Sequence, residues 1–218
     1  MMKKCNVIVG KTEYKNYPLQ QSRKTESGYY KEILDVMIRL LLAMQNRRWN
    51  LVFALHLRFP VDYPFFVIGN MLLMQFLERF AERLKYKMLY HYLWVREQDG
   101  GLHPHYHIIF IVDGDRCYSG WDWMEIAQEI WAKVLKIQSG KGLVHVSDPE
   151  PFPLEHAPEY KVSDEYKKYQ VSYGMMIDNR ASDADARREE VFDWICYFAK
   201  VYSKHSGTGC RSFGTSRF

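Results

Sequence analysis

Four stretches of the chain carry apolar residues at intervals of three and four, the spacing that gathers them on one face of a helix. These stretches cover residues 29–46, 67–85, 123–135 and 187–204. The first three are rich in large apolar side chains, so we expect scaffold helices whose apolar faces belong to a core and not to a cofactor site.

Shorter apolar and aromatic segments lie between the helices, and we interpret them as β-strands. They cover residues 51–58, 90–97, 105–112, 142–147 and 168–177. Helices and strands in this order predict an α+β fold, in which an antiparallel sheet of about five strands carries packed helices.

The length of 218 residues suits one domain better than two. We expect the domain to span residues 28–218 and to follow a polar, basic and loosely packed arm over residues 1–27. No stretch reaches the roughly 18 apolar residues of a membrane span, and the basic N-terminus lacks the apolar segment of a secretion signal. The four cysteines are scattered, without a Cys-x-x-Cys pair, which predicts reduced thiols in a cytoplasmic protein.

Charge is unevenly distributed along the chain, although its sum is only +4. Residues 3–48 hold ten Lys and Arg against four Asp and Glu, and only basic charges follow Asp193. Residues 148–193 reverse the balance, with twelve acidic and six basic residues. Basic ends fit a partner that is held by its phosphates, and a solvated surface of uneven charge is the alternative.

Three histidines, His103, His105 and His107, alternate with other residues at the start of the third predicted strand. Strand side chains point to opposite faces with a period of two, so His105 and His107 share a face, about 7 Å apart along the chain. Two imidazoles placed in this way suit one metal ion. The alternative is a His-rich turn that begins an ordinary buried strand.

The strand before the histidines ends at Glu97 and is followed by a turn-like segment, which together predict a hairpin. If Glu97 lies opposite His105, Val95 falls opposite His107, and Glu97 shares the face of both histidines. Two imidazoles and one carboxylate leave coordination positions open. Such a site suits Mg²⁺ or Mn²⁺ held against a phosphate better than structural zinc.

The last predicted helix carries Tyr197 and Lys200, which are neighbours on a helix surface because they are three residues apart. Its apolar stripe includes Phe198 and Tyr202, whereas Tyr197, Lys200 and Lys204 fall together on another side. A phenol beside ammonium groups is placed to attack a phosphodiester, since lysine favours the phenolate and neutralises charge on the phosphate. A solvated helix face with a chance tyrosine is the alternative.

Together, the histidine strand and the later Tyr-x-x-Lys helix resemble the HUH endonuclease superfamily of rolling-circle replication initiators and relaxases. The order of the motifs at residues 94–97, 104–107, 197–200 and 211–217 is most similar to the inovirus-type replication proteins of filamentous phages and prophages. The resemblance covers residues 28–218.

The resemblance implies a ferredoxin-like or RRM-like palm and a metal-dependent nickase and joinase that cuts one DNA strand at a specific site. It implies His105, His107 and Glu97 as ligands of Mg²⁺ or Mn²⁺, Tyr197 as the nucleophile that forms a 5′-phosphotyrosine link, and Lys200 as its helper. Single-stranded origin DNA would be the substrate, with a host helicase and polymerase as further partners and no membrane. A relaxase or transposase of the same chemistry and a non-catalytic DNA-binding prophage protein stay open as alternatives.

Members of the superfamily with two tyrosines carry the second about one turn after the first. This chain has Val201 there, and Tyr202 is assigned to the apolar stripe.

The remaining histidines have less distinct settings. Pro104 restricts His103 to an extended conformation beside the turn, so we expect His103 to support the site indirectly or to contact DNA. We expect His56 to be packed or hydrogen-bonded rather than catalytic, and we assign no role to His145 or His156.

Overall fold

The computed structural model describes residues 6–64, 69–85, 89–98, 100–117, 119–147, 174–202, 204 and 210–217. Residues 148–173 lie outside the described part of the chain, and with them His156, much of the acidic stretch over residues 148–193 and most of the strand predicted over residues 168–177. Among the described helices, none is both long and apolar enough to cross a membrane.

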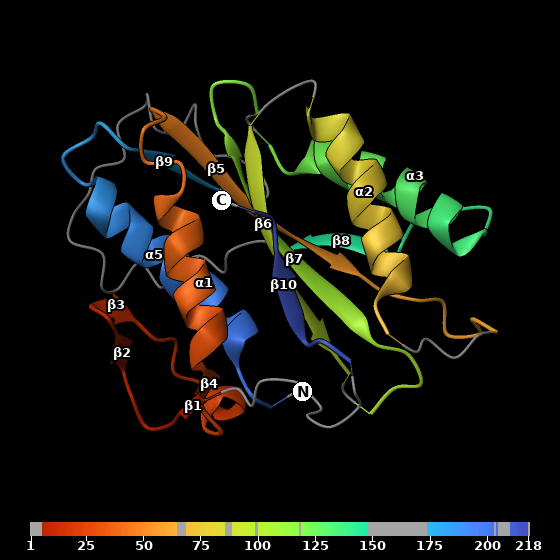
Figure 1. The fold of residues 1–218 in the computed structure, drawn as a ribbon, viewed down its shortest axis with the longest axis horizontal. Coiled ribbons are helices and arrows are strands. Elements are labelled where there is room, and N and C mark those ends of the chain that lie inside the picture. The colour runs from red at the N-terminus through yellow and green to blue at the C-terminus, as the bar shows by residue number, and fades with distance from the viewer. Residues whose placement is uncertain are drawn as a thin grey trace.

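A six-stranded sheet forms the middle of the molecule (Figure 1). Its strands, from one edge to the other, are β10 (Phe213–Thr215), β6 (Tyr90–Glu97), β7 (His105–Asp113) and β5 (Trp49–Leu57), followed by β8 (Val144–Ser147) and β9 (Met175–Asp178), which both pair with β5. All of these pairs are antiparallel. The prediction of an α+β fold with an antiparallel sheet is therefore confirmed.

Strand β10 is the sheet strand that the sequence does not predict, because it has only three residues and contains a glycine. Gly214 lies opposite Trp94 of β6, and a Cβ atom at position 214 would come within 2.8 Å of the Trp94 indole. Glycine at this position lets the two backbones pair beneath the indole ring. The motif at residues 211–217 thus supplies the strand at one edge of the sheet.

Two pairs of helices cover the two faces of the sheet, with α1 (Lys31–Leu42) and α5 (Ala184–Cys196) on one face and α2 (Met71–Lys85) and α3 (Trp121–Leu135) on the other (Figure 1). Successive residues of β7 face opposite cores: Ile108 packs in the core under α2 and α3, and Ile109 in the core under α1 and α5. A strand buried on both faces needs apolar residues at nearly every position, which explains the continuous apolar run of β7.

The N-terminal segment is more closely packed than its polar composition predicts. Its described part forms the short strands β1 (Val7–Ile8), β2 (Glu13–Tyr14), β3 (Tyr17–Pro18) and β4 (Tyr29–Tyr30), with a 3-10 turn at Arg23–Thr25. Leu19 is buried, and the Tyr17 ring lies 4.7 Å from the Phe192 ring of α5. Over residues 6–27, a few apolar side chains thus anchor an otherwise polar and largely exposed segment to the helices.

The helix predicted over residues 187–204 is also shorter than expected. Helix α5 ends at Cys196, one 3-10 turn follows at Tyr197–Ala199, and Lys200 is extended. Lys200 forms a β-bridge with Tyr29, and the Val201 amide donates a hydrogen bond to the Gly28 carbonyl at 2.9 Å. Pairing with the N-terminal segment replaces the further helical turns, so Tyr202 does not join an apolar stripe and is 62% exposed.

Candidate metal centre

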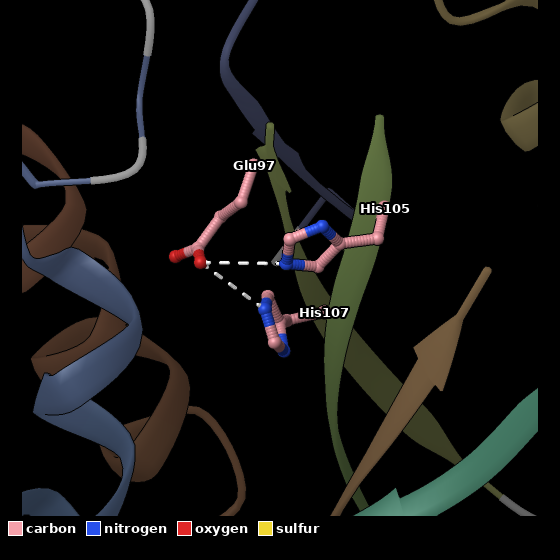
Figure 2. A group of neighbouring side chains, drawn as sticks. All are labelled: Glu97, His105 and His107. Carbon is pink, nitrogen blue, oxygen red and sulfur yellow. Dashed lines mark ion pairs between the residues drawn. The ribbon is translucent and has the colours of Figure 1, made fainter. Parts of the chain in front are cut away.

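The β6–β7 hairpin brings three possible metal ligands to one face of the sheet. Glu97 lies opposite His105, and Val95 lies opposite His107, which is the register that the sequence predicts. The side chains of Glu97, His105 and His107 therefore project toward the layer formed by α1 and α5 (Figure 2).

The carboxylate of Glu97 reaches both histidine rings (Figure 2). Its Oε2 atom lies 3.3 Å from Nε2 of His107 and 3.6 Å from Nε2 of His105. One ligand atom of each residue lies within 4.8 Å of the other two. Donor atoms that share a divalent ion at about 2.1 Å are roughly 3 Å apart, so only small movements separate this group from a coordination shell.

Burial adds a second reason why the group can hold a metal ion. Glu97 and His107 are 2% and 6% exposed, and His105 is partly exposed. Among the described residues, Nδ1 of His107 has no hydrogen-bond partner, and Nε2 faces the Glu97 carboxylate. A buried polar atom without a hydrogen bond is costly, and an ion bound at the His107 ring would remove part of this cost.

Two lysines from the segment after α5 contact the same carboxylate. Lys200 Nζ lies 2.9 Å from both oxygens of Glu97, and Lys204 Nζ lies 2.9 Å from Oε1. Both lysines are buried, so neither lies on a solvated helix face. The sequence places Lys204 near Lys200 but gives no sign of its contact with Glu97, because that contact depends on where the helix ends.

Lys200 also contacts the predicted nucleophile. Its Nζ lies 4.0 Å from the centre of the half-buried Tyr197 ring, a distance at which a cation is attracted to an aromatic face. Lys200 thus joins Tyr197 to Glu97. Five residues from motifs about ninety positions apart lie in one region, and the roles predicted for them stay predictions.

The electrostatics of the centre favour metal-binding protonation states. Burial alone would raise the pKa of Glu97, but the His105 and His107 rings and the Lys204 ammonium outweigh it and hold that pKa far below its usual value. Burial lowers the pKa of His107 to about 4. Near neutral pH, Glu97 is therefore a carboxylate and His107 a neutral imidazole, the forms that bind a metal ion.

The ring of His107 is held between two other rings. The centre of the His56 ring lies 4.1 Å away and that of Phe198 lies 4.7 Å away. His56 sits opposite His107 in β5, and its Nε2 shares a hydrogen bond with the Ser147 hydroxyl. Burial lowers the pKa of His56 to about 2. His56 is thus packed and hydrogen-bonded as expected, and it helps to fix the orientation of the His107 ring.

His103 lies apart from the other two histidines of its motif. Its ring centre is 5.6 Å from that of Phe59 and 5.8 Å from that of Tyr63, and Phe59 belongs to the core under α2 and α3. His103 is not a member of the Glu–His–His group. Its expected contact with DNA stays a prediction.

Comparisons of the chain with protein-family models, with curated proteins and with solved structures found no match. The chemistry of the candidate centre therefore rests on the contacts, burial and charges of its own residues.

Proposed function

We propose that the protein is a metal-dependent nickase and joinase that opens one DNA strand at a specific site and starts rolling-circle replication of a phage, prophage or plasmid. One observation carries this proposal: Glu97 contacts the two histidines of β7 and also Lys200, which lies against Tyr197. A metal-binding group and a nucleophile with its own cation are thereby joined in one region.

The reaction is a transesterification at a phosphodiester. A Mg²⁺ or Mn²⁺ ion held by Glu97, His105 and His107 would polarise the scissile phosphate. The Tyr197 oxygen attacks the phosphorus in line, the bond from phosphorus to the 3′ oxygen breaks, and that oxygen takes up a proton to become a 3′ hydroxyl. The 5′ phosphate stays on Tyr197, and the free 3′ hydroxyl primes synthesis. Because the phosphotyrosine link conserves the energy of the broken bond, the reverse attack rejoins the strand without ATP.

Lys200 has two functions in this scheme. Its ammonium group lies against the Tyr197 ring and would help to hold that ring in position for the attack. It also offers a positive charge to the phosphate oxygens, on which negative charge develops during the attack. Burial of Lys200 strengthens both effects, because little water screens its charge.

The composition of the metal group favours an initiator over a relaxase. A relaxase is expected to use three histidines, whereas in this chain Glu97 joins His105 and His107 and His103 lies elsewhere. We place the proposed activity in the cytoplasm, where the described cysteines, Cys117, Cys196 and Cys210, would stay free thiols.

A covalent adduct tests the proposal. Incubation with Mn²⁺ and a pool of single-stranded DNA of random sequence should give a protein–DNA adduct that survives denaturation. The sequence of the attached DNA then identifies the cleavage site. Tyr197→Phe should form no adduct. Tyr202→Phe is the matched control, because Tyr202 is an exposed tyrosine five residues away, and it should react like the wild type.

Two results would contradict the proposal. If Tyr197→Phe forms the adduct as the wild type does, Tyr197 is not the nucleophile. DNA binding without any adduct, at any divalent metal concentration, would favour the non-catalytic DNA-binding protein.

A further inference from the structure

Lys200 and the histidine rings meet at the same oxygen of Glu97. Oε2 is the atom that lies 3.3 Å and 3.6 Å from the Nε2 atoms of His107 and His105. It is also 2.9 Å from Nζ of Lys200. A metal ion held by the three ligands would therefore occupy the side of the carboxylate that an ammonium group already contacts.

A divalent ion is attracted to the Glu97 carboxylate more strongly than the Lys200 ammonium is. It carries two charges and binds a carboxylate oxygen at about 2.1 Å, whereas the ammonium carries one charge and lies farther from the same oxygen, so the ion's attraction is roughly three times larger. The ion and the ammonium also repel each other across a site that holds little water. Lys204 contacts the other oxygen, Oε1, so Glu97 keeps a partner if Lys200 leaves.

We propose that metal binding displaces Lys200 from Glu97, and that the released ammonium forms a binding site for a phosphate-like anion, so that the centre takes up metal and anion cooperatively. This inference rests on the proposed function, whose metal ligands it uses. Lys200 is well placed for the change because its Nζ already lies against the Tyr197 ring, beside which the scissile phosphate would bind. From this inference we expect the protein to bind the metal ion weakly when no phosphate is present, and more tightly when the substrate phosphate binds Lys200.

Coupling of this kind is reciprocal, and typical coupling changes an affinity by about 5-fold to 150-fold. We therefore expect sulfate, which is a phosphate-like anion, to tighten Mn²⁺ binding at least about fivefold. In chloride, without a phosphate-like anion, Lys200→Met should bind Mn²⁺ more tightly than the wild type, because a competitor for Glu97 has gone. If Lys200 only positioned Glu97, the same variant would bind Mn²⁺ more weakly, so the sign of the change separates the two roles.

The experiment measures free Mn²⁺ by electron paramagnetic resonance during titration of the whole protein, in chloride and in sulfate at equal ionic strength. We expect the wild type to bind Mn²⁺ more tightly in sulfate than in chloride, and Lys200→Met to bind Mn²⁺ equally in both salts. Lys133→Met is the matched control, because Lys133 makes an exposed ion pair with Glu129, and it should behave like the wild type. Lys200→Gln serves as a second variant if Lys200→Met does not fold, and the wild-type comparison needs no variant.

Two outcomes overturn the inference alone: equal Mn²⁺ affinity in chloride and sulfate, or weaker Mn²⁺ binding by Lys200→Met in chloride. The proposed function survives either outcome if the Tyr197 adduct still forms. Failure of the wild type to bind Mn²⁺ in both salts overturns the inference together with the metal centre.

Discussion

At the scale of residues, His103, His105 and His107 share a parity but not an environment. His105 and His107 face Glu97, whereas His103 packs against Phe59 and Tyr63. The period of two of a strand holds only while the strand continues, and β7 begins at His105. The turn before Pro104 is what separates the third histidine from the other two.

Alanine substitutions in this motif should have unequal effects on metal binding. His105→Ala and His107→Ala each remove an imidazole that faces Glu97 and should abolish Mn²⁺ binding, as measured by calorimetry. Glu97→Ala should weaken it clearly. His103→Ala is the control and should keep measurable binding. Loss of the metal in His103→Ala together with its retention in Glu97→Ala would indicate a three-histidine site instead.

The buried imidazole of His107 should make stability depend on pH. Burial lowers its pKa from 6.5 to about 4, so between these pH values the unfolded chain binds more protons than the folded protein. Its contribution is complete above pH 6.5 and is lost as the pH falls toward 4. On the order of 3 kcal/mol of unfolding free energy should disappear in this window through His107.

Urea unfolding of the metal-free protein at a series of pH values measures this effect. The free energy of unfolding of His107→Gln should change less steeply with pH than that of the wild type. His145→Gln is the control, because His145 is an exposed histidine of β8, and it should keep the wild-type slope. Equal slopes for His107→Gln and the wild type would contradict the assignment.

The three possible metal ligands could be predicted because strand parity and hairpin register are local rules. Glu97, His105 and His107 follow from them directly. The contact between Lys204 and Glu97 could not be predicted, since residues 97 and 204 meet only if the chain leaves the helix after Cys196.

At the scale of elements, the end of α5 is set by a distant segment. After one 3-10 turn, the backbone of residues 200–201 pairs with Tyr29 and Gly28 instead of continuing the helix. Helical periodicity in the sequence cannot reveal such competition, because the competing partner lies about 170 positions earlier. The N-terminal segment thereby fixes the backbone that carries Lys200.

A substitution at Gly28 should disturb this arrangement. Gly28 has a φ of +89°, and a Cβ atom there would lie 2.2 Å from the Ile8 carbonyl oxygen. Gly28→Ala must therefore move β1 away from β4, and it should disturb the hydrogen bond that the Val201 amide donates to the carbonyl of residue 28. We expect a loss of unfolding free energy of about 2 kcal/mol or more and a slower formation of the Tyr197 adduct.

Gly10→Ala is the matched control for this effect. Gly10 also has a positive φ, +67°, but nothing lies within 4 Å of the position of its Cβ atom. Gly10→Ala should lower the free energy of unfolding only by the cost of a left-handed backbone at a residue with a side chain, about 1 kcal/mol. The rate of adduct formation should stay the same. Equal losses in the two variants would show that contact with Ile8 is unimportant.

At the scale of the whole molecule, the sheet separates two cores that serve different purposes. The core under α2 and α3 is built from large apolar and aromatic side chains. The opposite face of the sheet, under α1 and α5, also carries the centre at one end of β6 and β7. The α+β class could be predicted because all four described helices carry apolar residues at helical spacing, and five of the six strands fall on short apolar or aromatic segments between them. Strand β10 and the packing of residues 6–27 could not, since each depends on a few contacts with residues distant in sequence.

Anomalous diffraction from crystals grown with Mn²⁺ would show whether Glu97, His105 and His107 bind one divalent ion. We expect one strong anomalous peak within bonding distance of Nε2 of both histidines and of a Glu97 oxygen. Crystals of His107→Gln grown in the same way should lack it. A peak at other residues, or no peak at a saturating Mn²⁺ concentration, would mean that these three residues do not hold the ion.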